Sequence, residues 1–293
     1  MIRFEIVAAL LLCSACQPPV DMSDDNRKAE PSASTGVIPK ATDLAVFKID
    51  RTAWHVISVN DRAAQATKDD DGVLLKPKIE FASGNASGFS GCNSFGGLYS
   101  QIDGKLYFGR SISTEQGCSD ALGMQENALY ALLAGEVDAR VDAQGRLFLK
   151  RGTQKAVLER AEDCVSCKSA WQPKVNLVGP VWNIEAINGR NPTGRDVFKN
   201  ENNYMLKFMA NSFQFRVGCN TISGSYRLEA SRLITSSGVA TEIGCSPELL
   251  AQDQLVSRIL SENPSVVHGH NMDMMLTSKA GMIELQGPPD QRK

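Results

Sequence analysis

The chain has 293 residues, 42% of them hydrophobic, and a formal net charge of −2. This charge balance offers no attraction for nucleic acid, and no basic stripe interleaved with aromatic residues is present, so we expect no nucleic-acid partner. The length predicts about two domains, and beyond the N-terminus no apolar run approaches the roughly 18–20 residues that a membrane-spanning helix needs.

Residues 1–16 have the pattern of an export signal. Arg3 supplies a short positive start, residues 6–12 form an apolar run, and small residues precede Cys16. The segment resembles a bacterial lipoprotein signal, in which the cysteine is acylated and becomes the new N-terminus. We therefore predict lipidation at Cys16, with an ordinary cleaved signal as the alternative.

Residues 17–43 follow as a flexible tether. They are rich in Pro, Ser, Asp and Ala, with too few large apolar side chains to bury a core. Because Gln17, and not Asp, follows Cys16, the lipoprotein resemblance implies an outer-membrane protein that faces the periplasm in a Gram-negative cell. The predicted membrane contact is the lipid anchor alone.

Two short motifs occur twice at a fixed offset of 127 residues, which indicates two copies of one domain. They are a Gly-Cys-Asn triplet and a Thr-x-x-x-Cys segment. Tyr99 and Tyr226 keep the same offset, and Trp54 and Trp182 are one residue further apart. The motif positions are Gly91, Cys92, Asn93, Thr114 and Cys118 in the first copy, and Gly218, Cys219, Asn220, Thr241 and Cys245 in the second.

Short alternating runs separated by turn residues predict strands in the first copy. Asp103-Gly104 is a strong hairpin signal, and leucines near helical spacing predict a helix from about Ser119 to Leu133. The expected strands are 54–59, 78–81, 98–102, 105–108, 136–141, 146–149 and 156–158.

The second copy repeats the pattern. Ser246 and Pro247 are suited to the start of a helix, and Asn263-Pro264 predicts its end. The expected strands are 181–187, 204–208, 213–217, 226–228 and 274–276. Many short strands and one helix per copy predict a mainly β (α+β) fold, made of two small antiparallel sheets or barrels in tandem.

Each copy begins with a strand led by Trp and continues with Gly-Cys-Asn, a strand with Tyr, and Thr-x-x-x-Cys before a helix. This order resembles the META domain, also called HslJ-like. The resemblance implies domains at 44–160 and 178–287, with a linker at 161–177 and a tail at 288–293. It also implies a bacterial envelope protein, in some relatives linked to heat shock or antibiotic tolerance, with no established catalysis.

Removal of the signal leaves six cysteines besides Cys16, which in an oxidising compartment favours disulfides. Sequence alone allows 15 connectivities. If both copies fold alike, a bond within one copy has its counterpart in the other, which favours Cys92–Cys118 and Cys219–Cys245. A cysteine nucleophile needs a base, and no histidine is duplicated with the cysteines, so we expect no catalytic site.

The remaining pair, Cys164 and Cys167, forms a CxxC between the copies. We expect a structural disulfide, with thiol–disulfide redox activity as the alternative. A zinc site is not expected, because a second CxxC that would complete it is missing. His268-Gly269-His270 is interpreted as a solvated turn, and Asp69-Asp70-Asp71 as an acidic turn.

We therefore expect no metal and no cofactor. The predicted role is non-enzymatic: a binding or structural module whose partner is an unknown envelope protein or a small ligand. The alternatives are a periplasmic redox protein that uses Cys164 and Cys167, and a carrier of a small ligand.

Overall fold

The computed structural model describes residues 47–168, 176–195, 204–236, 238–269 and 272–288. The predicted signal, the acylation site at Cys16 and the tether at 17–43 lie outside these residues. So do positions 169–175 of the linker and 289–293 of the tail. In the described part of the chain, no helix has the length and apolar character needed to cross a membrane.

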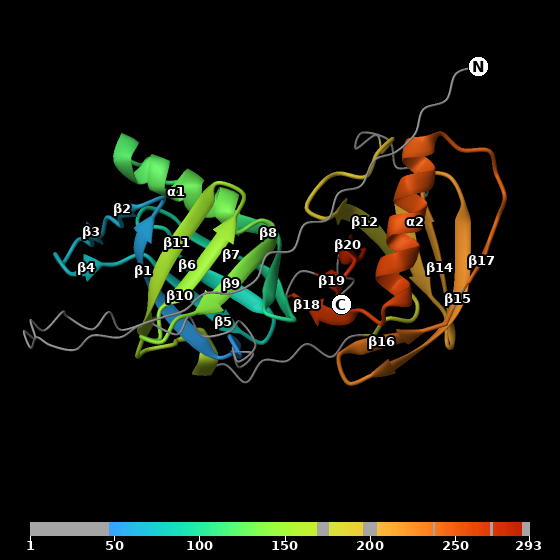
Figure 1. The fold of residues 1–293 in the computed structure, drawn as a ribbon, viewed down its shortest axis with the longest axis horizontal. Coiled ribbons are helices and arrows are strands. Elements are labelled where there is room, and N and C mark those ends of the chain that lie inside the picture. The colour runs from blue at the N-terminus through green and yellow to red at the C-terminus, as the bar shows by residue number, and fades with distance from the viewer. Residues whose placement is uncertain (1–46, 169–175, 196–203, 237, 270–271, 289–293) are drawn as a thin grey trace, which may run out of the picture. The chain divides into compact units, whose positions relative to one another are not determined.

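The first domain is a closed barrel of eight antiparallel strands (Figure 1). Each strand pairs with the next along the chain, and the last pairs back with the first, from Ala53–Ala161 to Val59–Ala156. The strands are β1 (Thr52–Val59), β5 (Lys78–Ala82), β6 (Asn85–Phe89), β7 (Ser94–Ile102), β8 (Lys105–Ser113), β9 (Gly135–Val141), β10 (Leu147–Arg151) and β11 (Gln154–Ala161).

The second domain repeats this barrel with the same order of strands. In both domains the single α-helix lies between the fifth and sixth strands of the ring. The predicted mainly β fold with one helix per domain is therefore confirmed. The strands are β12 (Val181–Ile187), β13 (Tyr204–Phe208), β14 (Ser212–Val217), β15 (Thr221–Glu229), β16 (Arg232–Thr235), β18 (Ser265–His268), β19 (Asp273–Ser278) and β20 (Gly281–Gln286).

Several short elements lie outside the two eight-stranded barrels. β2 extends the first sheet beside β1, β17 extends the second beside β15, and β3 and β4 form a separate hairpin. Asp69 closes the turn of that hairpin, since its carboxylate accepts hydrogen bonds from the amides of Asp71 and Val73. These elements are β2 (Arg62–Ala63), β3 (Thr67–Lys68), β4 (Leu74–Leu75), β17 (Val239–Ala240) and the 3₁₀ turn η1 (Ser166–Lys168).

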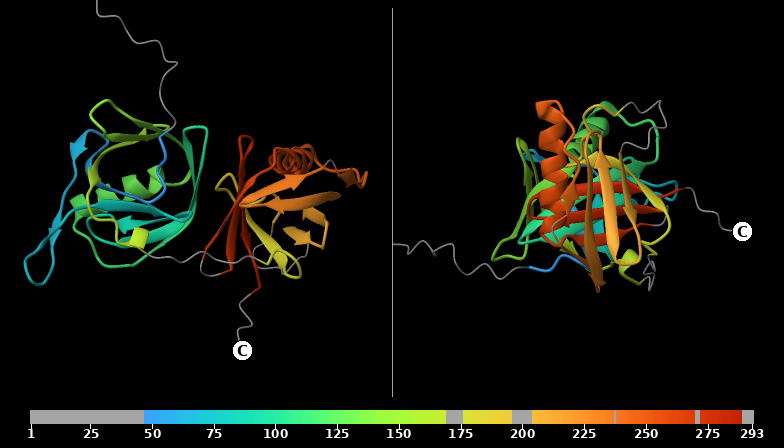
Figure 2. Two further views of the ribbon diagram at one scale, coloured as in Figure 1. Left: turned by 90° about the horizontal axis from the view of Figure 1, so that it is seen from below. Right: turned by 90° about the vertical axis from the view of Figure 1, so that its right-hand side faces the viewer.

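The helices are α1 (Asp120–Leu132) and α2 (Pro247–Ser261), and the left view of Figure 2 shows α2 end-on beside its strands. Ser246 caps α2, because its side chain accepts a hydrogen bond from the Leu249 amide. Ser119 occupies the same position before α1 but makes no side-chain cap bond with any residue that the structure describes. Each helix buries an apolar stripe against its own barrel.

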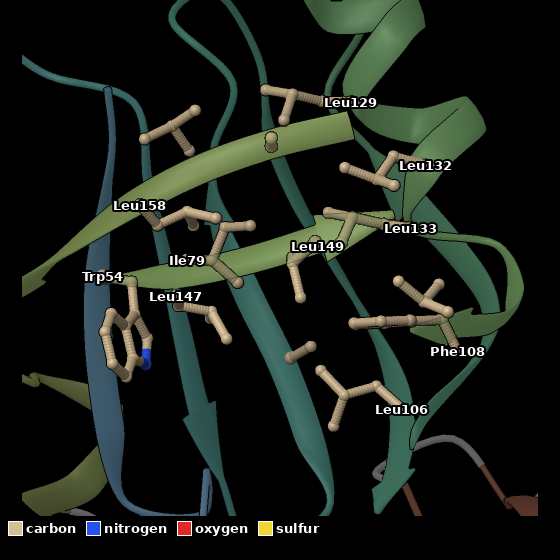
Figure 3. Packing of buried hydrophobic residues seen from close by; sticks show 14 of the residues in the cluster. Trp54, Ile79, Leu106, Phe108, Leu129, Leu132, Leu133, Leu147, Leu149 and Leu158 are labelled. Carbon is tan, nitrogen blue, oxygen red and sulfur yellow. The ribbon is translucent and has the colours of Figure 1, made fainter. Parts of the chain in front are cut away.

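The interior of each barrel is a packed core. In the first domain, Leu147 and Leu149 of β10 alternate inward and meet leucines from the face of α1 (Figure 3). The second core is built in the same way around Trp182, which is 2% exposed. Because the inward side chains fill the rings, burial of apolar surface is the main stabilising term in both domains.

We predict that Leu158→Ala lowers the free energy of unfolding of the first domain by about 2–5 kcal/mol, because it leaves a cavity in a core where Leu158 is fully buried. The matched control is Glu159→Ala at the next, exposed position of β11, which we expect to change stability by less than about 0.5 kcal/mol. Urea unfolding followed by circular dichroism measures both changes. Equal midpoints for the two variants would contradict the assignment of Leu158 to the core.

Candidate functional site

The duplicated Gly-Cys-Asn motif forms a tight turn at the same place in each barrel, between β6 and β7 and between β14 and β15. Gly91 has φ of 106° and Gly218 has φ of 103°, a region that side chains disfavour. A Cβ on Gly91 would lie 2.7 Å from the Gln125 side-chain nitrogen, and one on Gly218 would lie 2.8 Å from the Tyr204 hydroxyl. Both glycines are therefore required by conformation and by space.

The asparagine of the motif connects this turn to the second motif. Asn93 is 3% exposed, and its Oδ1 accepts hydrogen bonds from the Thr114 hydroxyl at 2.8 Å and from the Gln116 amide at 2.7 Å. Asn220 does the same with the Thr241 hydroxyl at 3.1 Å and the Ile243 amide at 3.0 Å. The motif Asn and the motif Thr are equally far apart in both copies because the two residues are joined by the same hydrogen bonds in each domain.

Each network is also closed by a disulfide. The structure joins Cys92 to Cys118 and Cys219 to Cys245, with Cα atoms 5.9 Å and 6.1 Å apart. Both bonds link the turn to the residue that precedes the N-cap of the helix. A loop of this length contributes about 3 kcal/mol in the chain-entropy model. Such bonds are consistent with a location outside the cytoplasm.

A carboxylate on the helix completes each cluster, and sequence analysis missed it. Glu126 of α1 accepts hydrogen bonds from the backbone and side-chain nitrogens of Asn93, and Asp253 of α2 does so from Asn220. These acids are also 127 residues apart. Extension of the repeat comparison into the helix would have found them, although Glu and Asp differ in length.

A glutamine next to each acid ties a further loop to the turn. Gln125 accepts from the Gln65 amide at 2.7 Å and donates to the Ser90 carbonyl at 2.7 Å. Gln252 makes the same two contacts, with the Thr193 amide at 2.7 Å and with a carbonyl of the second turn at 2.9 Å. The helix thus holds both sides of the turn through two consecutive side chains.

The two carboxylates differ in their surroundings. Glu126 accepts additional hydrogen bonds from the hydroxyls of Ser90 and Tyr130. The equivalent positions, 127 residues later, hold Val217 and Ser257. The contacts of Asp253 are fewer: its Oδ2 accepts from Asn220, while its Oδ1 has no hydrogen-bond partner among the described residues.

This difference moves the two pKa values in opposite directions. Burial opposes ionisation of Glu126, but the hydrogen bonds from Ser90 and Asn93 outweigh it and hold its pKa below the usual value. At Asp253, which is 2% exposed, burial dominates and raises the pKa. The hydrogen bonds from Asn220 and the charge of Arg216 only partly offset that burial.

The CxxC pair is disulfide-bonded, with Cα atoms 5.2 Å apart, and its loop is held by an acid of the first barrel. Glu80 of β5 accepts hydrogen bonds from the Val165 amide, the Ser166 amide and the Ser166 hydroxyl. Lys78 pairs with Glu80 at 2.8 Å. Against the opposing effect of burial, the bonds from Lys78 and Ser166 hold the pKa of Glu80 at about 2.

Other sequence candidates lie away from these clusters. Burial lowers the pKa of His268 to about 4, and its ring lies 6.2 Å from that of Trp182, so the interpretation of His268 as a solvated turn residue is wrong. The strand β18 extends through His268 and packs it against the core. His270 lies outside the described residues.

Two groups have donor atoms close enough for one cation: Cys92, Cys118 and Glu126, and Cys219, Cys245 and Asp253. Within each group the sulfur and carboxylate atoms all lie within 4.8 Å of one another. In the disulfide form, however, the sulfurs are not thiolates and do not serve as metal ligands.

The META domain model matches residues 47–163 and 175–286, which together make up most of the chain. An NMR structure of a protein from Burkholderia xenovorans is 24% identical, with a TM-score of 0.30, over 43% of this chain and 100% of that one. A second NMR structure is 22% identical, with a TM-score of 0.33, over 38% of this chain and 90% of that one. Both TM-scores are too low to indicate a shared fold. No curated protein matches the chain.

We predict that Glu126→Gln destabilises the protein by about 1–3 kcal/mol at neutral pH, because it removes an ionised acceptor with four donors. Asp253→Asn removes a buried charge with an unsatisfied oxygen, so we expect a smaller loss. Chemical denaturation of both variants tests this order. A larger loss for Asp253→Asn would mean that the carboxylate of the second domain is better satisfied than its contacts indicate.

We predict that Glu80 contributes about 1–3 kcal/mol of stability at neutral pH. Because its pKa is lowered to about 2 in the folded state from 4.5, this contribution is present above pH 4.5 and is lost as the pH falls toward 2. The urea midpoints of wild type and Glu80→Gln should therefore differ at pH 7, and the difference should narrow as the pH falls from 4.5 toward 2. A difference independent of pH would contradict the role of the ionised carboxylate.

Proposed function

We propose that this chain, which belongs to the META domain family, is a non-enzymatic envelope lipoprotein whose two domains form a binding or structural module. The observation that carries the proposal is the use of the duplicated side chains. The motif asparagines, cysteines and helix carboxylates are engaged with one another inside each domain, and hold a turn, a connecting segment and a helix together.

Such a network does not supply the parts of a nucleophilic site. A cysteine nucleophile needs a thiolate and a base, whereas both motif cysteines are oxidised. In the described part of the chain, the hydrogen bonds of the two clusters include no histidine. These contacts support a structural role for the motif, in which it shapes a surface, and not a catalytic role.

The contacts of the CxxC loop favour a structural disulfide over the redox alternative. A reactive CxxC thiolate is stabilised by amide groups at a helix start and by nearby positive charge. Here the amides of Val165 and Ser166 donate to Glu80 instead. These two amides are therefore engaged and are not available to stabilise a thiolate at Cys164 or Cys167.

The packing of side chains inside the two barrels counts against the alternative role as a carrier of a small ligand. Barrels that carry a small ligand keep an internal cavity, whereas small barrels without one are filled by side chains. The inward side chains of both rings are buried and contact one another, and Leu147, Leu158, Leu206 and Phe215 are at most 1% exposed. A partner would therefore meet the outer surface of the domains.

Attachment is proposed to occur through Cys16 and the tether at 17–43. We predict that cells fed an alkyne-tagged fatty acid label the wild-type protein and the Cys13→Ala control, and that Cys16→Ala loses the label. Membrane fractionation should show a matching release of Cys16→Ala into the soluble fraction. A labelled, membrane-bound Cys16→Ala protein would contradict the lipoprotein proposal.

The non-enzymatic role has its own test with the same protein. The oxidised chain should not catalyse reduction of insulin disulfides by a small dithiol above the rate of a Cys164→Ser/Cys167→Ser control. Catalysis that depends on this pair would favour the redox alternative.

A further inference from the structure

We propose that reduction of the Cys219–Cys245 disulfide converts the cluster of the second domain into a site for a thiophilic divalent cation such as Zn²⁺. The two thiolates and the carboxylate of Asp253 are the protein ligands, and water fills the remaining position. The site is specific to the second domain, although the first domain has the same framework. It goes beyond the proposed envelope role and does not depend on it.

The donor atoms are already gathered. The sulfurs of Cys219 and Cys245 and a carboxylate oxygen of Asp253 lie within 4.8 Å of one another. Tetrahedral Zn²⁺ with sulfur at about 2.3 Å and oxygen at about 2.0 Å needs ligand atoms roughly 3.5–3.8 Å apart. A disulfide holds its two sulfurs closer than this, so the site requires the S–S bond to be opened. Cys245 is partly exposed, which gives both the reductant and the cation a way in.

An independent feature points to a missing ligand. Asp253 is 2% exposed, yet its Oδ1 has no hydrogen-bond partner in the described part of the chain. A buried carboxylate oxygen without a partner is costly, and native proteins satisfy nearly all such groups. Its Oδ2 is fixed by the backbone amide of Asn220 at 3.1 Å and by the side-chain amide at 3.2 Å. The carboxylate is thus held through one oxygen, while the other has no donor among the described residues.

The neighbours of these ligands suit a cation as well. The Asn220 side chain also donates to the Cys245 sulfur at 3.1 Å, and such outer contacts orient metal ligands. The positive charge of Arg216 acts on Asp253. Two thiolates and one carboxylate carry three negative charges, which Zn²⁺ and Arg216 neutralise together. Hard cations such as Mg²⁺ prefer oxygen ligands and are excluded by the sulfur pair.

The first domain provides an internal comparison. Both carboxylate oxygens of Glu126 accept hydrogen bonds: Oε1 from the Asn93 side chain, and Oε2 from Ser90, Tyr130 and the Asn93 amide. A cation there would have to displace these donors. In the second domain Val217 has no hydroxyl in place of Ser90, and Oδ1 of Asp253 has no donor among the described residues.

The chemistry requires a dithiol reductant from outside the chain. By thiol–disulfide exchange, two electrons pass from that dithiol, which becomes a disulfide, and Cys219 and Cys245 become thiols. Binding of Zn²⁺ then forms two Zn–S bonds and one Zn–O bond and releases two thiol protons to water. In the reverse exchange, a disulfide oxidant takes up two electrons and becomes a dithiol, Cys219 and Cys245 form their disulfide again, and the cation is released, so occupancy follows the redox state.

The test is a titration of the full chain with Cd²⁺, whose bonds to thiolates give a strong ultraviolet charge-transfer band. The chain carries Cys164→Ser and Cys167→Ser, is reduced without oxygen by a phosphine, and is followed in parallel by circular dichroism. We expect one tight site per reduced chain, displaced by Zn²⁺ and not by Mg²⁺, and absent from the oxidised chain.

Variants assign the site. Cys219→Ser/Cys245→Ser should abolish tight binding, whereas Cys92→Ser/Cys118→Ser should retain it. Asp253→Asn, which the contacts above predict to fold, should weaken binding at least about tenfold, while the matched Glu126→Gln should not weaken it. The proposal is overturned by equal affinity in Asp253→Asn, by dependence on the first-domain cysteines, or by a reduced chain that is unfolded and stays so with the cation.

Discussion

The architecture of each domain depends on one buried amide, the side chain of Asn93 or Asn220. Its oxygen accepts from the Thr-x-x-x-Cys segment, and its nitrogen donates to a carboxylate on the helix. Three parts of the chain, the turn between two strands, the segment that leads into the helix and the helix itself, are thereby connected through a single group. Because both the oxygen and the nitrogen of this side-chain amide are hydrogen-bonded to protein groups and shielded from water, the asparagine fixes the relative positions of all three parts.

The disulfide and the motif glycine support the same junction in different ways. The disulfide restricts the unfolded chain and joins the turn to the helix start. The glycine allows the backbone conformation at Gly91 and Gly218 and leaves room for the side chains that pack above it. The cysteines are therefore part of the scaffold while they remain oxidised. The proposed second role belongs to the second domain, where an oxygen of the helix carboxylate Asp253 has no hydrogen-bond partner among the described residues.

Sequence patterns identified most strands because alternation of polar and apolar residues directly reflects a half-buried pleated surface. The range 181–187 agrees with β12, and 204–208 agrees with β13. The strand β6 was not predicted, because Asn85–Phe89 contains Ser, Gly and Asn and lacks an apolar run. It is a strand because β5 and β7 pair with it on both sides. Such pairing is a tertiary effect that local propensity does not contain.

The sequence by itself determined that the chain is a duplication, that each copy is mainly β with one helix, and which residues recur. These facts follow from spacing and periodicity, which are properties of a linear chain. Only the tertiary structure decided that Glu126 and Asp253 belong to the motif clusters, and that the loop of Cys164 and Cys167 is held by Glu80. These groups meet across 33 to 86 residues of chain, so their contacts depend on closure of the barrels and not on any local pattern.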